Sequence, residues 1–233
     1  MSDTPYGAAL IVGAGSGISA SVARKFAAAG LKVGLAARNP DKLAPLAAEI
    51  GAETFAVDAA DPAAVARLFE EADARLGEPD VVVYNASGRT RARIIDLDPE
   101  AVRQAIAVSA FGGFLVVQQA ARRMTPKGHG AILLTGATAS VKGFPLSAAF
   151  AMGKFALRGL AQSAARELAP QGVHVAHFII DGGVRSAMRP DPADRPDATL
   201  DPDAIAQSYL DILRQPRSAW TWELELRPWV ESF

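Results

Sequence analysis

The chain of 233 residues carries 24 basic and 25 acidic side chains, for a formal net charge of -1, and 50% of its residues are hydrophobic. That hydrophobic fraction is enough to bury a substantial core. The balanced charge argues against a broad basic surface for nucleic acid or an anionic membrane. The absence of cysteine excludes disulfides, thiol nucleophiles and thiolate metal sites. The three histidines do not form a cluster of ligands, so we expect no metal.

The sequence gives no sign of a targeting or membrane-spanning segment. Residues 1–6 lack the basic and apolar regions of a signal peptide. No apolar run approaches the roughly 18 residues that a membrane span needs. We therefore expect a cytoplasmic protein with no membrane or nucleic-acid partner.

Short apolar runs alternate with longer helical patterns along the chain. Strands are expected at 8–13, 32–37, 53–57, 81–85, 131–136, 173–180 and 222–226. Helices are expected at 17–29, 40–50, 62–75, 99–124, 147–169 and 202–214. Three of these helices open with Asp followed by Pro, a pair that caps the N-terminus and suits the first helical position. Repeated strand–helix units predict an α/β fold with a parallel sheet.

Two segments near the C-terminus stand apart from this alternation. Residues 181–200 have no helix or strand pattern, and their place after the sixth strand predicts a substrate lid over the ligand crevice, with an irregular surface loop as the alternative. The tail at 219–233 contains all three tryptophans and is expected to close a sheet edge, a subunit contact or the crevice. Because no linker or repeat divides the chain, we expect a single domain over residues 1–233.

A glycine-rich turn follows the first expected strand and opens the first helix. Its sequence is Gly13-Ala14-Gly15-Ser16-Gly17-Ile18-Ser19. Glycines let the backbone turn tightly and approach a pyrophosphate, whose charge is met by unpaired N–H groups at the helix N-terminus. The strand–turn–helix context favours a dinucleotide site over a purely structural turn.

The end of the second strand favours NADP(H) over NAD(H). Folds that select NAD place an acidic residue there on the ribose 2′-hydroxyl, whereas this chain has Ala36-Ala37-Arg38-Asn39. Arg38 is suited to bidentate contact with a 2′-phosphate, and no carboxylate stands there to repel it. A solvated cation at the helix entry is the alternative for Arg38.

The order and spacing of four features resemble the short-chain dehydrogenase/reductase family. These features are the glycine turn, Asp58, the run Asn85-Ala86-Ser87-Gly88 and Lys154. The resemblance covers essentially the whole chain. It implies a Rossmann-type, doubly wound parallel sheet of about seven strands in the order 3-2-1-4-5-6-7, with helices on both faces. It also implies that Asp58 contacts the adenine amino group and that Lys154 contacts the nicotinamide ribose.

The resemblance extends to residues 181–186, which are similar to the family's Pro-Gly-x-x-x-Thr segment beside the nicotinamide amide. Asp181 replaces the proline, and Val184 and Ser186 match the contacting positions. The cofactor-binding candidates are Gly13, Gly15, Ser16, Gly17, Ile18, Arg38, Asp58, Ala59, Asn85, Ala86, Ser87, Lys154, Gly182, Val184 and Ser186.

The expected reacting centre departs from the family pattern at three of four positions. Family members that reduce carbonyls use Tyr-x-x-x-Lys on one helical face, and the matching segment here runs from Phe150 to Lys154. Phe150 has no proton to donate. Ala137 stands at the position of the family's serine, with Thr138 next to it, and Ser109 stands at the position of its asparagine. The catalytic candidates are Lys154, Thr138 and Ser109.

Three hypotheses for the function remain open. In the first, hydride passes to an acceptor that needs no phenolic acid, such as an activated enone or enoyl thioester. In the second, another donor replaces the phenol in carbonyl reduction, and the candidates are Thr138, Ser140, Ser147, Tyr84 and Asp181. In the third, NADP(H) is bound without hydride transfer, by a sensor, structural or assembly protein. The leading hypothesis is an NADP(H)-dependent oxidoreductase with a non-standard centre, acting on a small-molecule carbonyl, alcohol or activated alkene.

Outside the cofactor motifs, Arg89, Arg91 and Arg93 are candidates for binding an anionic substrate tail, with a solvated loop as an equal alternative. His177 is expected to be a hydrogen-bonded core residue. The helices at 99–124 and 147–169 carry apolar residues on more than one face: Phe111, Phe114, Val116, Val117, Phe155 and Leu160. The resemblance implies that these helices form a four-helix interface in a homodimer or homotetramer, and packing on the sheet is the alternative.

Overall fold

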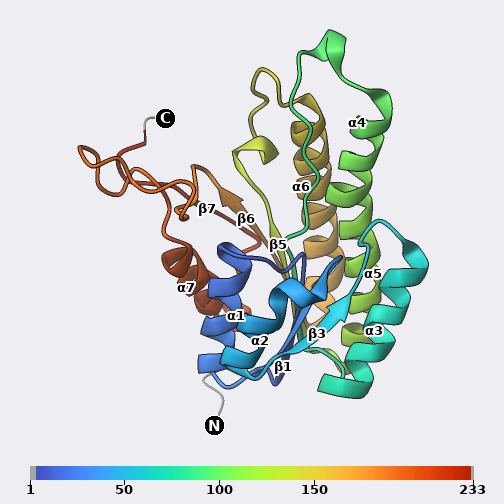
Figure 1. The fold of residues 1–233 in the computed structure, drawn as a ribbon. Coiled ribbons are helices and arrows are strands. Elements are labelled where there is room, and N and C mark those ends of the chain that lie inside the picture. Colours follow the sequence, from blue (N-terminus) through green and yellow to red (C-terminus); the bar gives the residue numbers. More distant parts are fainter. Residues whose placement is uncertain (1–3, 232–233) are drawn as a thin grey trace.

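The computed structural model describes residues 4–231 and contains one seven-stranded sheet, in which neighbouring strands run parallel in the order β3-β2-β1-β4-β5-β6-β7 (Figure 1). The strands are β1 (Ala8–Val12), β2 (Lys32–Ala37), β3 (Glu53–Ala56), β4 (Val81–Tyr84), β5 (Gly130–Thr135), β6 (Val173–Ile180) and β7 (Glu223–Leu226). The predicted α/β class and strand order are confirmed. The strand order reverses direction between β1 and β4, where a doubly wound sheet opens a ligand crevice.

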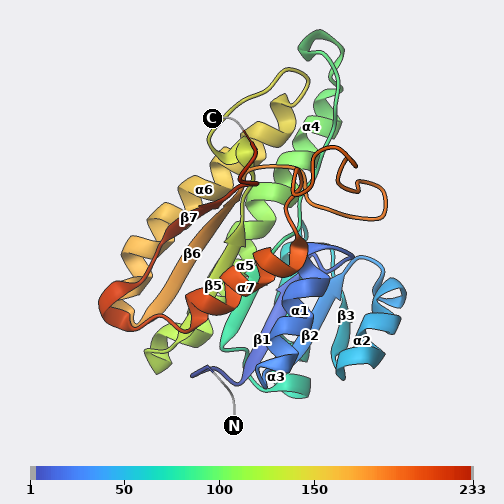
Figure 2. The ribbon, with the colours of Figure 1, turned by 90° about the vertical axis from the view of Figure 1, so that its left-hand side faces the viewer.

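Helices cover both faces of this sheet (Figures 1 and 2). One layer contains α1 (Ile18–Ala28), α2 (Ala44–Ile50) and α7 (Pro202–Leu213). The other contains α3 (Pro62–Leu76), α4 (Pro99–Ile106), α5 (Gly112–Met124) and α6 (Ala148–Leu168). Asp61, Asp98 and Asp201 cap α3, α4 and α7 by accepting backbone N–H groups, as the Asp-Pro pairs predict.

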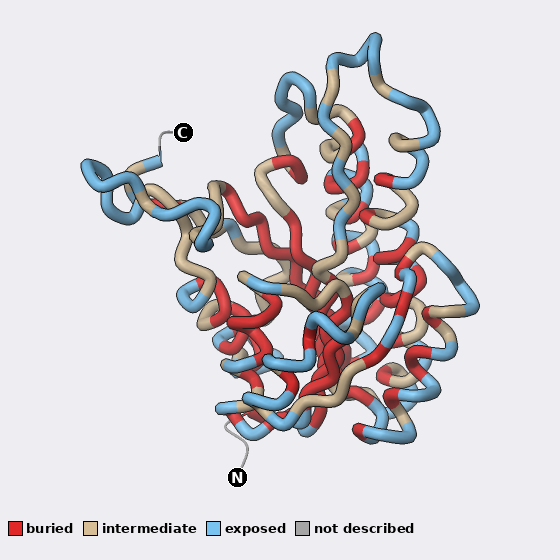
Figure 3. Tube along the Cα trace, viewed as in Figure 1, coloured by how far each residue is buried: buried red, intermediate tan, exposed pale blue. Residues whose placement is uncertain are grey.

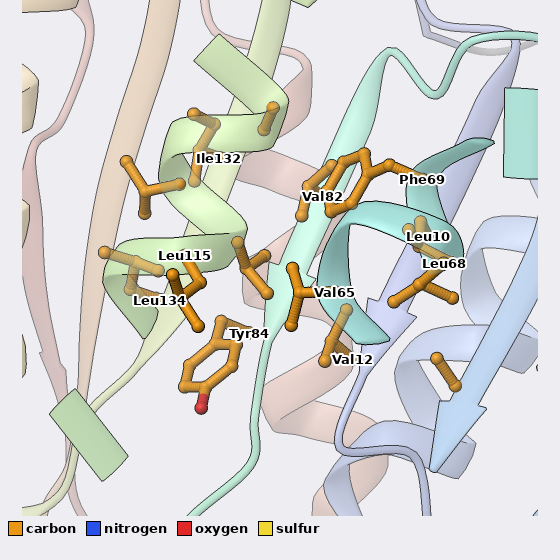
Figure 4. Packing of buried hydrophobic residues seen from close by; sticks show 14 of the residues in the cluster. Leu10, Val12, Val65, Leu68, Phe69, Val82, Tyr84, Leu115, Ile132 and Leu134 are labelled. Atoms are coloured by element: carbon orange, nitrogen blue, oxygen red, sulfur yellow. The ribbon is translucent and has the colours of Figure 1, made fainter. Parts of the chain in front are cut away.

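The core lies between the sheet and these two helical layers, and buried residues concentrate along the strands (Figure 3). Along β1, Leu10 and Val12 pack on the α3–α5–α6 side, whereas Ala9 and Ile11 pack on the α1–α7 side. Figure 4 shows one side of this packing, where Leu10, Val12, Val82, Tyr84, Ile132 and Leu134 of the sheet meet Val65, Leu68 and Phe69 of α3 and Leu115 of α5. Burial on both faces explains why these strands are continuous hydrophobic runs.

The helix expected at 99–124 is interrupted. A π-helical turn, Ala107–Phe111, joins α4 to α5, and the Tyr84 hydroxyl donates a hydrogen bond to the Val108 carbonyl in that turn. A π-helical turn displaces carbonyls from the regular α-helical pattern, and the phenol satisfies one of them. The helix expected at 40–50 likewise begins with a 3-10 turn, Pro40–Leu43.

The helical stretch Pro99–Lys127 is long and apolar enough, by length and composition alone, to span a membrane. The expectation that no segment passes this test is therefore wrong. The test is weak evidence for a span, because a core helix of a soluble protein passes it too. In the fold, Leu115, Val116, Ala120 and Met124 of this stretch are buried in the core beside the sheet.

Residues 181–200 form an ordered excursion beyond the carboxyl ends of the strands, coloured orange in Figure 2. Backbone bridges join Val184 to Leu200 and Ser186 to Arg189. Asp191 accepts hydrogen bonds from the backbone and hydroxyl of Thr199, at 2.8 and 2.5 Å. Local polar contacts therefore give the segment a defined shape without a helix.

The tail expected at 219–233 closes the sheet edge through β7, and its residues 232–233 lie outside the described part of the chain. The ring of Trp220 stacks on His174, with centroids 4.6 Å apart. Trp229, in contrast, is 81% exposed. The first tryptophan therefore packs on the edge, whereas the last contributes little to the core.

Candidate active site

Two cavities adjoin at the carboxyl ends of the strands and share Asn85, Ser87, Arg89 and Thr90. The larger, of about 1210 Å³, follows the ends of β1, β2 and β4 and is called the cofactor cavity below. The smaller, of about 670 Å³, lies beside β5, β6 and the 181–200 segment and is called the acceptor cavity. A ligand with two joined halves fits this arrangement better than a single compact molecule.

The glycine turn lines the cofactor cavity with bare backbone. Gly13 has φ of +85°, and a Cβ added there would lie 2.2 Å from the backbone nitrogen of Ala86, so both its conformation and its neighbour require glycine. A Cβ added at Gly15 or Gly17 would meet nothing within 4 Å, so both face open space. No side chain caps the N-terminus of α1, which leaves its first N–H groups free for an anion. The turn therefore fits a pyrophosphate.

A hydrogen-bond chain fixes the turn against the end of β4. Ser19 Oγ donates to the Gly13 carbonyl at 3.1 Å and accepts from Asn85 Nδ2 at 2.7 Å. Asn85 thus supports the turn through Ser19 in addition to lining both cavities. This polar chain connects the two family motifs that the sequence separates by more than sixty residues.

At the end of β2, the cofactor cavity is lined by Arg38, Asn39 and Lys42. Arg38 and Lys42 are exposed and add two positive charges where a 2′-phosphate is expected. The sequence analysis did not name Lys42 as a candidate. Its spacing, four residues after Arg38, was the only sequence feature that could have indicated a second cation at this place. Asp58 and Ala59 also line this cavity, and Asp58 Oδ1 accepts a hydrogen bond from the Ala60 N–H at 3.0 Å.

Lys154 lies at the floor of the acceptor cavity and is only 3% exposed. Its ammonium donates a hydrogen bond of 2.7 Å to the Thr135 carbonyl at the end of β5. Burial, and then the positive charge of Arg89, lower the pKa of Lys154 to about 7. A buried amine with this pKa changes its charge readily near neutral pH.

Phe150 lies one helical turn before Lys154 and lines the same cavity. Its ring centroid is 5.9 Å from the Lys154 ammonium. The guanidinium of Arg89 lies over this ring at 4.0 Å from the centroid. The position expected for the family's tyrosine therefore presents a ring face covered by a cation, and it offers no hydroxyl.

Of the five replacement donors proposed from the sequence, only Thr138 and Ser147 line the acceptor cavity. Among the described residues, no hydrogen bond engages the hydroxyl of either one. The Tyr84 phenol is buried on the α5 side of the sheet, and burial raises its pKa. Asp181 forms a buried ion pair with Arg227. Ser140 is fully buried, so these last three are poorly placed to reach an acceptor.

Ser109 is buried in the π-helical turn and lines neither of these cavities. Its hydroxyl accepts a hydrogen bond from the Gly88 N–H at 2.9 Å. Gly153 of α6 packs closely against Ser109, because a Cβ added at Gly153 would lie 2.7 Å from the Cβ of Ser109. Ser109 therefore contacts the loop that carries Ser87 and Arg89, and its catalytic role stays a prediction.

His177 is a buried, hydrogen-bonded residue of β6 that does not itself line the acceptor cavity. Its Nδ1 is 3.0 Å from Glu223 Oε2, and its Nε2 is 3.4 Å from Ser140 Oγ. Burial lowers the pKa of His177 to about 4, so the ring is neutral at pH 7 and Nδ1 donates to the carboxylate. Ser140 Oγ in turn accepts from the Ala137 N–H at 3.2 Å. This chain fixes the loop that carries Ala137 and Thr138.

The remaining cofactor candidates divide between the two cavities, with Gly13, Gly15, Ser16 and Ala86 on the cofactor cavity and Ile18, Gly182, Val184 and Ser186 on the acceptor cavity. Gly17 lines neither and serves as the N-cap position of α1. The sequence analysis missed Arg189 and the apolar wall formed by Phe144, Leu146 and Met188. These residues lie in loops, where no periodic pattern marks the side chains that face a ligand.

Comparison with known proteins identifies the family. The family described as short chain dehydrogenase matches residues 7–196. The L-2,3-butanediol dehydrogenase of Corynebacterium glutamicum is 32% identical over 189 residues, which are 77% of this chain and 72% of that protein. A short-chain dehydrogenase from Rhodopseudomonas palustris has a TM-score of 0.81 at 37% identity, covering 96% of this chain and 99% of the other.

A metagenomic short-chain oxidoreductase in complex with NADP has a TM-score of 0.84 at 29% identity, covering 95% of this chain and 97% of the other. The family match, the relatives and the two adjoining cavities agree with one another. The chain therefore belongs to the short-chain dehydrogenase/reductase family, whose members bind a nicotinamide cofactor.

Proposed function

We propose that this chain is an NADP(H)-dependent oxidoreductase that transfers hydride without a phenolic acid at position 150. The observation that carries the proposal is the pair of adjoining cavities, with the glycine turn in one and buried Lys154 in the other. In this proposal residues 1–233 form one domain, and residues 181–200 cover the acceptor as a lid. When bound, the cofactor supplies or accepts the hydride.

The charges around the end of β2 support NADP(H) over NAD(H). Arg38 and Lys42 line the cofactor cavity there, and the strand ends on Ala37 without an acidic residue. A guanidinium binds a phosphate bidentately, and the second cation adds to its attraction. The relative that was solved with NADP supports the same preference.

The side chains of the acceptor cavity support an activated alkene over an unactivated carbonyl as the substrate. The side chains of Phe150 and Ala137 offer only carbon, and no carboxylate of residues 4–231 lines the cavity. In this proposal Lys154 holds the ribose, and the hydroxyls of Thr138 and Ser147 are the candidate neutral donors, in a cavity that Ser87, Thr90, Thr135 and Ser186 also line. An enone or enoyl thioester needs less help from an acid, since its own carbonyl withdraws electrons from the double bond.

A titration with NADPH and NADH, followed by fluorescence, tests the cofactor half of this proposal. We expect tighter binding of NADPH, and we expect Arg38→Ser to reduce the preference by about tenfold, the effect of losing one charge-assisted hydrogen bond of about 1.5 kcal/mol. Lys32→Ser is the matched control, because Lys32 is an exposed cation at the opposite end of the same strand. Failure to bind either nucleotide would contradict the proposal.

A further inference from the structure

The acceptor cavity is lined by four cationic side chains and, among the described residues, by no acidic one. The cations are Arg89, Arg91, Lys154 and Arg189. Lys154 is assigned to the cofactor in the proposal above. The three arginines come from two separate segments, the loop after β4 and the 181–200 segment, which the fold brings to one mouth.

These arginines differ from their neighbours in having no carboxylate partner among the described residues. In the same segments, Arg93 pairs with Asp96 at 2.6 Å, and Arg185 pairs with Asp191 at 3.3 Å. Partial desolvation, and then the charge of nearby Arg189, lower the pKa of Arg89. Two like charges without a counter-ion repel each other, and an anion placed between them removes that cost.

The backbone positions both guanidinium groups at the cavity. The side chain of Arg189 passes over Gly183, where an added Cβ would lie 2.8 Å from its Nη1, and reciprocal backbone hydrogen bonds of 3.0 Å with Ser186 hold its turn. Arg89 lies over the Phe150 ring, a contact that uses the face of the guanidinium and leaves its N–H edges available. A tyrosine hydroxyl is not required for this stacking.

Part of the cavity wall is apolar. Phe144, Leu146 and Met188 line this part, and all three residues are exposed. We propose that the acceptor cavity binds an organic carboxylate, whose anionic group is held by Arg89 and Arg189 and whose apolar body packs on this wall. This proposal names the substrate class of the proposed oxidoreductase. It rests on that proposed function for the reaction alone, because binding of the carboxylate can be measured without turnover.

The test uses cinnamate and its neutral counterpart cinnamamide as probes, titrated by calorimetry into the full-length protein with and without NADPH. Cinnamate is expected to bind at least tenfold more tightly than cinnamamide. Arg89→Met and Arg189→Met should each weaken cinnamate binding by about tenfold, the loss of one charge-assisted pair, and leave cinnamamide unchanged. Arg93→Met is the control, because it removes the same charge from the same loop outside the cavity.

Equal binding of the two probes, or equal loss in Arg93→Met, would overturn the proposal.

Arg89 lines both cavities, so the same variants are also titrated with NADPH. Weaker NADPH binding with unchanged cinnamate binding would assign these arginines to the cofactor and overturn the carboxylate site. Tighter binding of phenyl phosphate than of cinnamate would overturn the choice of carboxylate. A wild-type protein that binds cinnamate but not NADPH would refute the oxidoreductase and leave the anion site standing.

Discussion

Lys154 is the residue on which the site depends most, and its position is costly. An ammonium that is 3% exposed has lost most of its hydration, and its hydrogen bond to the Thr135 carbonyl replaces only part of it. The nearby charge of Arg89 increases this cost. A protein keeps such a group only when it has a use, which agrees with a role in holding a cofactor.

This cost predicts how stability changes with pH. The pKa of Lys154 is about 7 in the fold, below its ordinary value of 10.5, so protonation favours the unfolded chain between these values and stability rises with pH across that window. Relative to Lys154→Met, the unfolding free energy of the wild type should rise by on the order of 3 kcal/mol between pH 7 and pH 10, measured by urea denaturation. Parallel pH curves for the two proteins would show that the ammonium is not destabilised.

Residue-level prediction from the sequence succeeded where the signal was local. The glycine turn is recognisable because a tight turn between a strand and a helix needs glycine at particular positions, and in the structure Gly13 has a positive φ and lies against the backbone of Ala86. Arg189 and Met188 were missed because their approach to the cavity depends on how residues 181–200 fold back. Tyr84 does not line the acceptor cavity, because its side chain packs in the core and its hydroxyl bonds the Val108 carbonyl, which the sequence does not reveal.

At the scale of elements, the break between α4 and α5 was the main difference from the expected helices. The hydrophobic pattern continues through 99–124, so periodicity alone cannot show that one turn is π-helical. The break has a function in the structure, since it places Ser109 against Gly88 and Val108 against the Tyr84 hydroxyl. The strand order, by contrast, followed from alternating strand and helix patterns together with the family resemblance.

The π-helical turn predicts a measurable role for Tyr84. Tyr84→Phe leaves the Val108 carbonyl without its phenolic donor, and the side chain is 0% exposed. We expect a loss of about 1–3 kcal/mol in the unfolding free energy, the usual cost of leaving a buried polar group unsatisfied. Urea denaturation of the variant measures it, and a loss below about 0.5 kcal/mol would mean that another group satisfies that carbonyl.

At the scale of the whole molecule, the outer face of α5 and α6 remains apolar. Phe111, Phe114, Met152 and Phe155 are between 42% and 53% exposed, whereas Val116 and Val117 pack in the core. The sequence allowed these apolar residues either to form a subunit interface or to pack on the sheet, and in the structure some are exposed while others pack on the sheet. We propose that the exposed set forms the four-helix interface of a homodimer or homotetramer, which agrees with the oligomeric habit of the family.

The same scale bears on the proposed activity. The cofactor cavity, the lysine and the cationic acceptor cavity adjoin one another, and Phe150 and Ala137 line the acceptor cavity where the family pattern has a tyrosine and a serine. The acceptor cavity of about 670 Å³ also contains Lys154, Val184 and Ser186, the residues expected to contact the nicotinamide half, so part of its volume is expected to belong to the cofactor. Turnover is therefore the property that separates the proposed oxidoreductase from the third hypothesis, binding without turnover.

Turnover without the phenol is the most direct test. NADPH oxidation is followed by absorbance with a panel of enones and carbonyl compounds, with and without a carboxylate, for the wild type, Phe150→Tyr and Lys154→Ala. We predict that the wild type reduces a carboxylate-bearing enone and that Lys154→Ala loses this activity. Turnover that appears only in Phe150→Tyr, with tight NADPH binding by the wild type, would contradict the account and identify a cofactor-binding protein that has lost the reaction.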